Sequence, residues 1–370
     1  MLQGACHGRQ ITLLVMPASL ADHTTLRLGG PAKSMLEAKT DDELVAAVAE
    51  RDAAGEPVLL LGGGSNLVIS DSGFDGTAIR ICTEGQRIER TQVDGVERVR
   101  VEVAAGEDWD AFVARTVEAG FGGLECMSGI PGRVGATPIQ NVGAYGWEVA
   151  DFLHSVRVYH RGSGERETMV PQQLALGYRT SRFKGTDEAV VLAVTFDLHA
   201  DGLSQPIRYA ELARTLGVEP GERVPAADVR EAVLLLRRDK GMVLDPDDHD
   251  TWSAGSFFTN PVLPAAEAAD ARQRIADIVG PDVRIPTYPA PGDAVKFSAA
   301  WLIERAGFGK GHQGPGGRVS LSTKHTLALT NRGSATTDDL LALAREVRDG
   351  VAAKFGITLH PEPLLIGCAL

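Results

Sequence analysis

Cysteine is scarce in this chain. The four among 370 residues, Cys6, Cys82, Cys126 and Cys368, lie far apart and form no Cys-x-x-Cys pair. Disulfide-stapled small proteins and zinc sites of closely spaced thiolates need more cysteines, or closer ones. We therefore expect neither a disulfide framework nor a bound metal. A reducing compartment, the cytoplasm, fits this composition.

Excess positive charge and long apolar runs are also lacking. Lys and Arg number 37 against 49 Asp and Glu, which gives a formal charge of −12. That balance argues against nucleic acid or an anionic membrane surface as the main partner, because both attract an excess of cations. No apolar run approaches the length of a membrane helix. An anionic ligand would have to be met by a local cluster of Arg, Lys and backbone N–H groups.

The first seventeen residues do not have the pattern of a signal peptide. Their apolar piece, 11–16, is short and has little basic charge before it. We expect residues 1–17 to be a disordered extension, or Met16 to be the true initiator. The rest of the chain is long enough for two or three soluble domains, and 44% of all residues are apolar.

The segment Ser128–Gly146 is unusually rich in glycine. Five of its nineteen residues are glycine, two are proline and only Arg133 is charged. No helix or strand period runs through it, so we expect an ordered loop with several unusual backbone angles. Closely spaced glycines let backbone N–H groups approach a phosphate or a ring carbonyl. Because Ile139 and Tyr145 lie among the glycines, the loop is predicted to pack against something large and flat.

A second glycine cluster, 62–66, lies between two predicted strands at 57–61 and 67–69. Its sequence Gly-Gly-Gly-Ser-Asn lacks the sixth-position glycine of a dinucleotide-binding turn, and no Gly-Lys-Ser/Thr follows as in a P-loop. We interpret it as a phosphate-binding loop outside these two classes.

Capping signals and hydrophobic periodicity predict the other elements. The predicted helices are one from the Thr40 capping box to Gly55, then 109–119, 226–238, 264–279, 298–306 and one capped at 336–339. The further predicted strands are 98–104, 155–160, 189–198 and 356–359. Strands mixed with single helices indicate α+β organisation and not a regular βαβ repeat.

Two polar stretches and two single polar residues could each be part of a functional site or only part of a turn, linker or surface contact. Taken by itself, the basic stretch 178–184 is predicted to be a solvated turn. The acidic stretch 245–250 lacks the glycine and glutamate of a calcium loop and is predicted to be a solvated linker. Ser256 is either a turn hydroxyl or a positioned proton donor, and it does not match Gly-x-Ser-x-Gly. Glu362, between two prolines, is either a rim salt bridge or a fixed catalytic acid.

Several of these stretches occur together in one enzyme family. They are Gly-Gly-Ser-Asn at 63–66, the 128–146 loop, Gly-Tyr-Arg-Thr-Ser at 177–181, Gly-Ser-Phe-Phe-Thr-Asn-Pro at 255–261 and the tail 360–367. On these motifs, in this order, the chain resembles the UDP-N-acetylenolpyruvoylglucosamine reductases. Members of that family are flavoenzymes of peptidoglycan precursor synthesis. The resemblance extends from about residue 20 to residue 366.

The resemblance implies an α+β chain with a two-subdomain FAD-binding fold of the vanillyl-alcohol-oxidase/PCMH type and an α+β substrate-binding domain. Residues 18–84 and 346–370 would form FAD-binding subdomain 1, residues 85–241 subdomain 2, and residues 242–345 the substrate-binding domain. FAD would be held noncovalently, and NADPH would reduce it before the enolpyruvyl uridine nucleotide enters the same cleft. A cytoplasmic monomer with no nucleic-acid or membrane partner is expected.

Three residues match catalytic positions of the family. Arg179 would bind the substrate carboxylate as negative charge builds there. Ser256 would protonate the C2 carbanion that forms when hydride from flavin N5 reaches C3, which yields UDP-N-acetylmuramate. Glu362 would orient or polarise the carboxylate.

The resemblance also implies a binding set. The substrate contacts would be Tyr209, Lys240, Asn260 and Gln313, and the tyrosine is typical of the longer class of these reductases. The residues expected to hold the cofactor belong to the two glycine-rich loops: Gly62, Gly63, Gly64, Ser65, Asn66, Ser128, Gly129, Ile130, Pro131, Gly132, Gly135, Ala136, Gln140, Asn141, Gly143, Ala144, Tyr145 and Gly146.

Two alternatives stay open at this stage. A related FAD-dependent oxidase would share the fold but act on another substrate, and such enzymes often tether the flavin through His or Cys. The 128–146 loop contains no His, and Cys126 lies just before it. A noncatalytic flavin-binding scaffold should have lost at least one of Arg179, Ser256 and Glu362, and all three are present.

Overall fold

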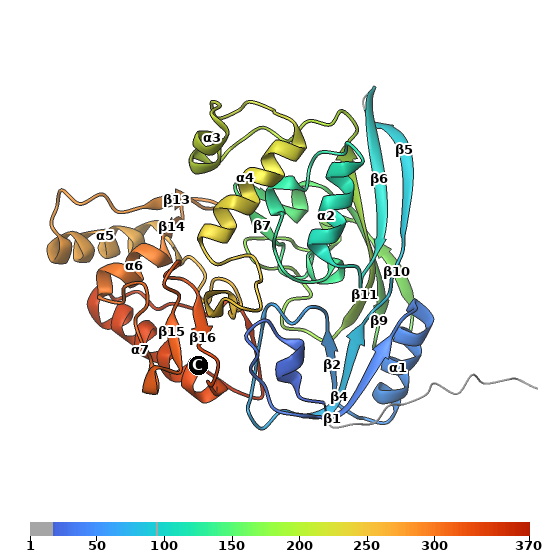
Figure 1. The fold of residues 1–370 in the computed structure, drawn as a ribbon, viewed down its shortest axis with the longest axis horizontal. Coiled ribbons are helices and arrows are strands. Elements are labelled where there is room, and N and C mark those ends of the chain that lie inside the picture. The colour runs from blue at the N-terminus through green and yellow to red at the C-terminus, as the bar shows by residue number, and fades with distance from the viewer. Residues whose placement is uncertain (1–17, 94) are drawn as a thin grey trace, which may run out of the picture.

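The computed structural model describes residues 18–93 and 95–370. The expectations for residues 1–17 lie outside the described residues. The described chain forms three units, named here by position: the N-terminal unit (residues 18–84), the central unit (85–241) and the C-terminal unit (242–359). A C-terminal tail, residues 360–370, returns to the N-terminal unit (Figure 1).

The N-terminal unit is built on a small parallel sheet of strand order β1-β4-β2. Its strands are β1 (Ala32–Ala38), β2 (Val58–Leu61) and β4 (Phe74–Ile81), and helix α1 (Asp41–Ala53) packs on them. The predicted N-cap starts α1, because Thr40 accepts a hydrogen bond from the Glu43 amide. The second bond of a capping box is not formed, since the Glu43 carboxylate accepts from the Lys39 amide and not from that of Thr40. The helix ends just before Gly55, as predicted.

The central unit holds a larger antiparallel sheet of order β10-β9-β11-β6-β5. Its strands are β5 (Gln86–Val93), β6 (Val96–Ala104), β9 (Leu153–His160), β10 (Arg166–Met169) and β11 (Ala189–His199). Helices α2 (Trp109–Glu118) and α4 (Ala226–Asp239) contribute buried side chains to the same core as this sheet, and α3 (Ala210–Leu216) lies beside α4. Between α2 and β9 runs the glycine-rich segment, with the short hairpin β7 (Gly143–Ala144) and β8 (Trp147–Glu148).

The C-terminal unit combines three helices with two small antiparallel sheets. The helices are α5 (Ala265–Val279), α6 (Ala299–Ala306) and α7 (Thr337–Phe355). The strands are β12 (Val262–Leu263), β13 (Thr287–Pro289), β14 (Val295–Phe297), β15 (Val319–Leu321) and β16 (Leu329–Asn331). One apolar cluster, separate from that of the central sheet, holds the unit together.

Helix α7 decides where the C-terminal unit ends. The predicted boundary between residues 345 and 346 falls inside this helix. Leu340, Val347 and Phe355, from its beginning, middle and end, are all buried in the C-terminal cluster. A helix that packs as one body along its length cannot be divided there, so α7 belongs to the C-terminal unit.

Two local predictions were wrong. Residues 356–359 form no strand, although Ile357 and Leu359 are buried with an exposed residue between them. That alternation comes from an extended connection lying on the core, and the strand is β17 (Leu364–Ile366), which pairs in parallel with β3 (Leu67–Ile69). The acidic stretch 245–250 is not simply a solvated linker. Asp250 is buried and accepts hydrogen bonds from the Thr323 amide and from Arg332.

The C-terminal unit is tied to the N-terminal unit by buried side-chain hydrogen bonds. Thr25 Oγ1 donates to Ser253 O at 2.6 Å, and Thr337 Oγ1 donates to Ile69 O at 2.6 Å. Asn331 Nδ2 donates to the carbonyl of Leu26 at 3.0 Å. None of the described helices is both long and apolar enough to cross a membrane.

The Thr337 bond yields a test of this attachment. Thr337 is fully buried, so Thr337→Val keeps the volume but removes the donor to Ile69 O, and we expect it to lower the free energy of unfolding by about 1–3 kcal/mol. Thr337→Ser loses a methyl group but keeps the hydroxyl. Urea unfolding should rank the valine variant below the serine variant, and the reverse order would show that packing, not the hydrogen bond, holds this contact.

Candidate active site

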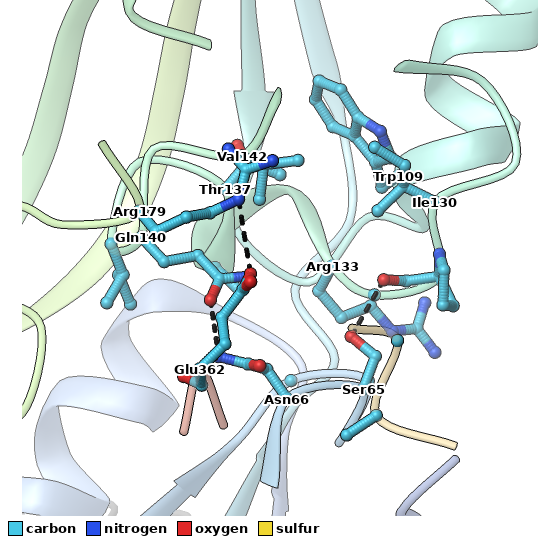
Figure 2. A pocket seen from close by; sticks show the side chains of 18 of the residues that line it. Ser65, Asn66, Trp109, Ile130, Arg133, Thr137, Gln140, Val142, Arg179 and Glu362 are labelled. Carbon is cyan, nitrogen blue, oxygen red and sulfur yellow. Dashed lines mark hydrogen bonds and ion pairs between the residues drawn. The ribbon is translucent and has the colours of Figure 1, made fainter. Parts of the chain in front are cut away.

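A cavity of about 510 Å³ lies where the three units and the C-terminal tail meet. Its wall includes the 62–67 loop of the N-terminal unit, most of the glycine-rich segment, Arg179, Ser256 and Glu362. Figure 2 shows two sides of this space: Gln140, Arg179 and Glu362 lie on one, and Trp109, Ile130 and Arg133 on the other. The volume is in the range typical of ligand sites.

The two glycine-rich loops cross at Gly63 and Gly132. A Cβ atom built on Gly63 would lie 2.7 Å from the Gly132 Cα atom, which is closer than real Cβ contacts allow. Ser65 fixes the crossing, because its hydroxyl donates to Pro131 O at 2.8 Å (Figure 2). Only glycine lets two backbones approach this closely, so the crossing explains the glycine at position 63. At Gly132 the φ of +136° is what favours glycine.

The segment Ser128–Gly146 is an ordered loop with left-handed backbone angles, as predicted. Positive φ values occur at three of its glycines and at Asn141 and Tyr145. Of the eighteen residues predicted to hold a cofactor, fourteen line the cavity: Gly62, Gly63, Gly64, Ser65, Asn66, Ile130, Pro131, Gly132, Gly135, Ala136, Gln140, Gly143, Ala144 and Tyr145.

Four predicted cofactor residues are not part of the cavity wall: Ser128, Gly129, Asn141 and Gly146. Ser128 is fully buried, and its hydroxyl donates to Glu125 O at 2.7 Å. The Asn141 amide donates to Gly177 O at 3.0 Å and accepts from the Ala150 amide at 3.0 Å. The side chains of Ser128 and Asn141 therefore make their hydrogen bonds within the protein and support the shape of the loop without being part of the cavity wall.

Arg179 and Glu362 form an ion pair at the cavity, with 3.3 Å between Arg179 Nε and Glu362 Oε1 (Figure 2). Their side chains are only 21% and 14% exposed. Arg179 Nη2 donates to Gly143 O at 2.7 Å, so the glycine-rich segment orients the guanidinium. Lys184 Nζ donates to Arg179 O at 3.0 Å. The stretch 178–184 is therefore not a solvated turn.

Ser256 is brought to the same cavity by backbone pairing. The amide of Glu362 donates to Phe257 O at 2.9 Å, and the amide of Thr259 donates to His360 O at 3.1 Å. This short antiparallel contact places the residue after Ser256 directly against Glu362. Two positions separated by a hundred residues in sequence thus line one cavity with Arg179.

Burial and opposite charge act against each other at Glu362. Burial raises the pKa of its carboxyl group, and the cations of Arg179 and Lys184 counteract that rise. Burial also lowers the pKa of Lys184. A carboxyl group whose pKa is raised beside a cation can exchange a proton more readily near neutral pH. This combination favours proton chemistry at the cavity.

The predicted substrate contacts divide into two groups. Tyr209 and Lys240 line the cavity, and the Tyr209 ring lies edge-on to Tyr145 with 5.5 Å between centroids. Asn260 does not line it; its side chain accepts a hydrogen bond from the Ala299 amide at the start of α6. Gln313 is exposed on the approach to β15 and is also outside the cavity wall.

Comparison with known proteins identifies the family. A model described as the UDP-N-acetylenolpyruvoylglucosamine reductase C-terminal domain matches residues 245–366, and an FAD binding domain model matches residues 32–169. A UDP-N-acetylenolpyruvoylglucosamine reductase from Saccharopolyspora erythraea is 62% identical over 353 residues, which cover 95% of this chain and 96% of the relative. The chain belongs to the UDP-N-acetylenolpyruvoylglucosamine reductase family.

A second relative and a solved structure of the same family are similar to this chain over nearly its whole length. One from Thermobifida fusca is 58% identical over 352 residues, covering 95% of this chain and 97% of the relative. The crystal structure of the reductase from Thermus caldophilus superposes with a TM-score of 0.63 at 25% identity, covering 96% of this chain and 99% of that one. The predicted α+β FAD-binding fold with a further α+β unit is confirmed.

The residues present fit the FAD that the family match implies. The matched region, 32–169, contains both glycine-rich loops, and their crossing brings bare backbone to the cavity wall. Backbone without side chains is what a nucleotide cofactor needs for close approach. Trp109, Ile139 and Val142 supply apolar surface beside this backbone.

Sequence reasoning missed six other polar or aromatic residues of this reductase-family cavity: Trp109, Arg133, Thr137, Lys184, Arg237 and His325. Arg133 is the only charged residue of the glycine-rich segment, and Lys184 closes the basic stretch, so both carried a usable signal. Arg237 lies in the last turn of α4, where a cation is already explained by the helix dipole. His325 stands in a short turn between β15 and β16, where no motif marks it.

The loop crossing predicts different outcomes for two adjacent glycines. At Gly62 an added Cβ atom would lie 3.5 Å from the nearest Arg133 atom, an ordinary contact, whereas at Gly63 it would lie 2.7 Å from Gly132. We expect Gly63→Ala to lower the free energy of unfolding of the apoprotein by about 1–3 kcal/mol and to reduce bound flavin. Gly62→Ala should leave apoprotein stability nearly unchanged. Thermal unfolding and the flavin-to-protein absorbance ratio measure both effects, and equal stability of the two variants would contradict the crossing.

Proposed function

We propose that the protein reduces UDP-N-acetylglucosamine enolpyruvate to UDP-N-acetylmuramate with NADPH as the reductant and FAD as the bound cofactor. The observation that carries this proposal is the meeting of Ser256, Arg179 and Glu362 at a cavity whose other wall is the crossed glycine-rich loops. This arrangement offers a hydroxyl, a cation and a carboxyl group beside a surface that suits a nucleotide cofactor.

The residues of the two glycine-rich loops, Tyr145 among them, are proposed to hold FAD. Within the proposal, residues 18–84 and 85–241 form the two FAD-binding parts, the C-terminal unit binds the substrate, and the tail brings Glu362 back to the site. When bound, FAD supplies hydride to the enolpyruvyl double bond after taking it from NADPH. The protein's own task is to bind the sugar nucleotide, neutralise its carboxylate and deliver a proton.

Arg179 is proposed to bind the enolpyruvyl carboxylate. Its guanidinium is anchored by Gly143 O and paired with Glu362, so it is oriented before substrate arrives. A planar guanidinium can hold a carboxylate through two parallel hydrogen bonds. Because electron density moves into that carboxylate as hydride reaches C3, a fixed cation stabilises the transition state more than the ground state.

Ser256 is proposed to donate the proton to C2. A serine hydroxyl is a weak acid, but a carbanion beside a carboxylate is a strong base, so a correctly placed hydroxyl suffices. Glu362, whose amide is bonded to the residue after Ser256, is proposed to hold the carboxylate and its surrounding charge in place. The raised pKa of Glu362 also suits a role in proton relay.

Tyr209 and Lys240 are proposed to contact the diphosphate of the sugar nucleotide. Lys240 is a compact cation in an acidic chain, and Tyr209 lies where an aromatic ring can cover the ligand. Asn260 and Gln313 remain proposed contacts on the family motif alone. The substrate is a soluble nucleotide of peptidoglycan synthesis, so we propose a cytoplasmic enzyme that acts as a monomer.

Anaerobic flavin absorbance tests the reaction. NADPH should bleach the visible flavin band, and the enolpyruvyl UDP-sugar should then restore it. Ser256→Ala should bleach normally but recover about 10²–10³-fold more slowly, because only the second half-reaction needs the proton. Ser72→Ala, which removes an exposed hydroxyl that contacts Ser70, should behave as the unmodified protein does.

Three outcomes would contradict the proposal in different ways. Bleaching without recovery would leave a flavoprotein with another substrate, as in the oxidase alternative. Normal recovery of Ser256→Ala would remove the serine from the proton step but keep the reaction. Absence of a flavin band after reconstitution with FAD would refute the whole assignment.

A further inference from the structure

The turn that presents Arg179 to the cavity has an unusual backbone. The Gly177 amide donates to Thr180 O at 3.0 Å, and the Thr180 amide donates to Gly177 O at 3.2 Å. Arg179, the third residue of this four-residue turn, has a φ of +54°. A positive φ at that position normally takes glycine, because a Cβ atom makes the left-handed conformation unfavourable. Arg179 therefore needs support from outside the turn.

Lys184 gives this support through the main chain. The chain folds back after the turn, and the Lys184 amide donates to Ser181 O at 3.2 Å. The Nζ of Lys184 then reaches the carbonyl oxygen of Arg179, to which it donates at 3.0 Å. Ser181 ties the same stretch to the glycine-rich segment, since its hydroxyl donates to Ile139 O at 2.6 Å. The ammonium group thus fixes the peptide unit that follows the left-handed residue.

The guanidinium of Arg179 is already compensated by carboxylates of the protein. Glu362 Oε1 lies 3.3 Å from its Nε (Figure 2), and Glu148 Oε1 lies 3.8 Å from its Nη1. The Glu362 side chain is only 14% exposed, so water screens this pair weakly. A substrate carboxylate that approached Arg179 alone would meet an ion pair whose charges largely cancel. A second cation is needed for a net positive charge at this end of the cavity.

Lys184 is in the right place to be that second cation. It lines the cavity with Arg179 and Glu362, it is half-buried, and it forms no ion pair with a carboxylate of the described residues. An ammonium group has three N–H donors, and the bond to Arg179 O uses one of them. Burial lowers the pKa of Lys184 and the Glu362 anion opposes this, so the two charges act on one another. Lys296 is a further cation near Arg179, but it lies over the Tyr178 ring and is not part of the cavity wall.

We propose that Lys184 is a positioning residue for carboxylate binding, which holds the left-handed backbone of Arg179 and supplies the positive charge that Glu362 cancels on the guanidinium. This inference rests on the proposed function for the role of Arg179 as the group that meets the substrate carboxylate, and it adds one residue to that site. Because Lys184 acts at the carboxylate end of the cavity, its effect depends on whether the ligand carries a carboxylate.

The charge of Lys184 acts most strongly in the step that reduces the substrate. Negative charge grows on the carboxylate as hydride reaches the neighbouring double bond, so a fixed cation there stabilises the transition state more than the ground state. NADPH brings no carboxylate to Arg179. Lys184 is therefore needed for the second half-reaction and not for the first.

Two nucleotides that differ by a carboxylate-bearing group test the proposal by binding alone. UDP-N-acetylmuramate carries a lactyl carboxylate, and UDP-N-acetylglucosamine lacks it. Methionine keeps the length of the lysine side chain but has neither the donor nor the charge. In calorimetric titrations of the flavin-loaded protein, Lys184→Met should bind UDP-N-acetylmuramate about tenfold more weakly than the unmodified protein does. It should bind UDP-N-acetylglucosamine about equally well, which also shows that the variant is folded.

A rescue variant and a matched control accompany this measurement. Lys184→Arg keeps a cation and its N–H donors, so it should regain most of the affinity for UDP-N-acetylmuramate. Lys33→Met removes an exposed lysine of β1 that is not part of the cavity wall, and it should bind both nucleotides as the unmodified protein does. In anaerobic flavin absorbance, Lys184→Met should bleach normally with NADPH and recover about 10²-fold more slowly with the enolpyruvyl nucleotide.

Equal losses for the two nucleotides in Lys184→Met would show a merely structural role and would overturn the proposal. Unchanged binding of UDP-N-acetylmuramate in that variant would overturn it as well. The proposed reaction stands or falls separately. A loss confined to the carboxylate ligand, with no reoxidation of reduced flavin by the enolpyruvyl nucleotide in the unmodified protein, would refute the reaction and leave Lys184 in its role.

Discussion

The C-terminal tail holds the candidate site together by backbone hydrogen bonds to two other parts of the fold. The amide of Glu362 donates to Phe257 O, the amide of Leu364 donates to Asn66 O, and β17 pairs in parallel with β3. Its one buried charge pairs with Arg179 of the central unit. The tail thus brings Glu362 to Arg179 and joins the segment after Ser256 to the loop and strand of the N-terminal unit.

The three units are joined to one another by contacts of different kinds. The C-terminal unit is attached to the N-terminal unit by Thr25, Asn331, Thr337 and the tail, all through buried hydrogen bonds. The C-terminal unit contacts the central unit at the cavity rim, for example through Lys296 over the Tyr178 ring at 4.2 Å. The N-terminal and central units instead share a buried apolar cluster to which Leu44 and Leu192 belong.

The cavity wall is rich in cations, although the chain as a whole carries a net negative charge. The protein has twelve more acidic than basic residues, yet the cavity wall gathers Arg179, Lys184, Arg237 and Lys240, and only Glu362 opposes them there. Local concentration of cations in a partly buried site is what an anionic ligand requires, because screening by water is weak there. Burial in this wall lowers the pKa values of Lys184 and Arg237.

Local signals allowed much of the fold to be predicted. The N-cap Thr40 and the capping box at Thr336 begin α1 and α7, and apolar periodicity marks α2, α4, β6 and β11. Such patterns are readable because they act over a few neighbouring residues. The prediction failed where burial came from distant partners. Residues 356–359 alternate like a strand but lie unpaired on a core, and the acidic Asp250 is buried because Thr323 and Arg332 satisfy it.

The sequence by itself determined the element types, the two glycine-rich loops and the family, since each depends on residue kinds at short spacing. Only the tertiary structure decided which side chains share the cavity. It turned Ser128 and Asn141 away to support the loop, left Asn260 and Gln313 outside the wall, and brought Arg237 and His325 into it. These outcomes depend on contacts between units that are far apart in the chain. No local pattern encodes them, because a side chain's partners across a domain boundary are set by packing and not by its neighbours in sequence.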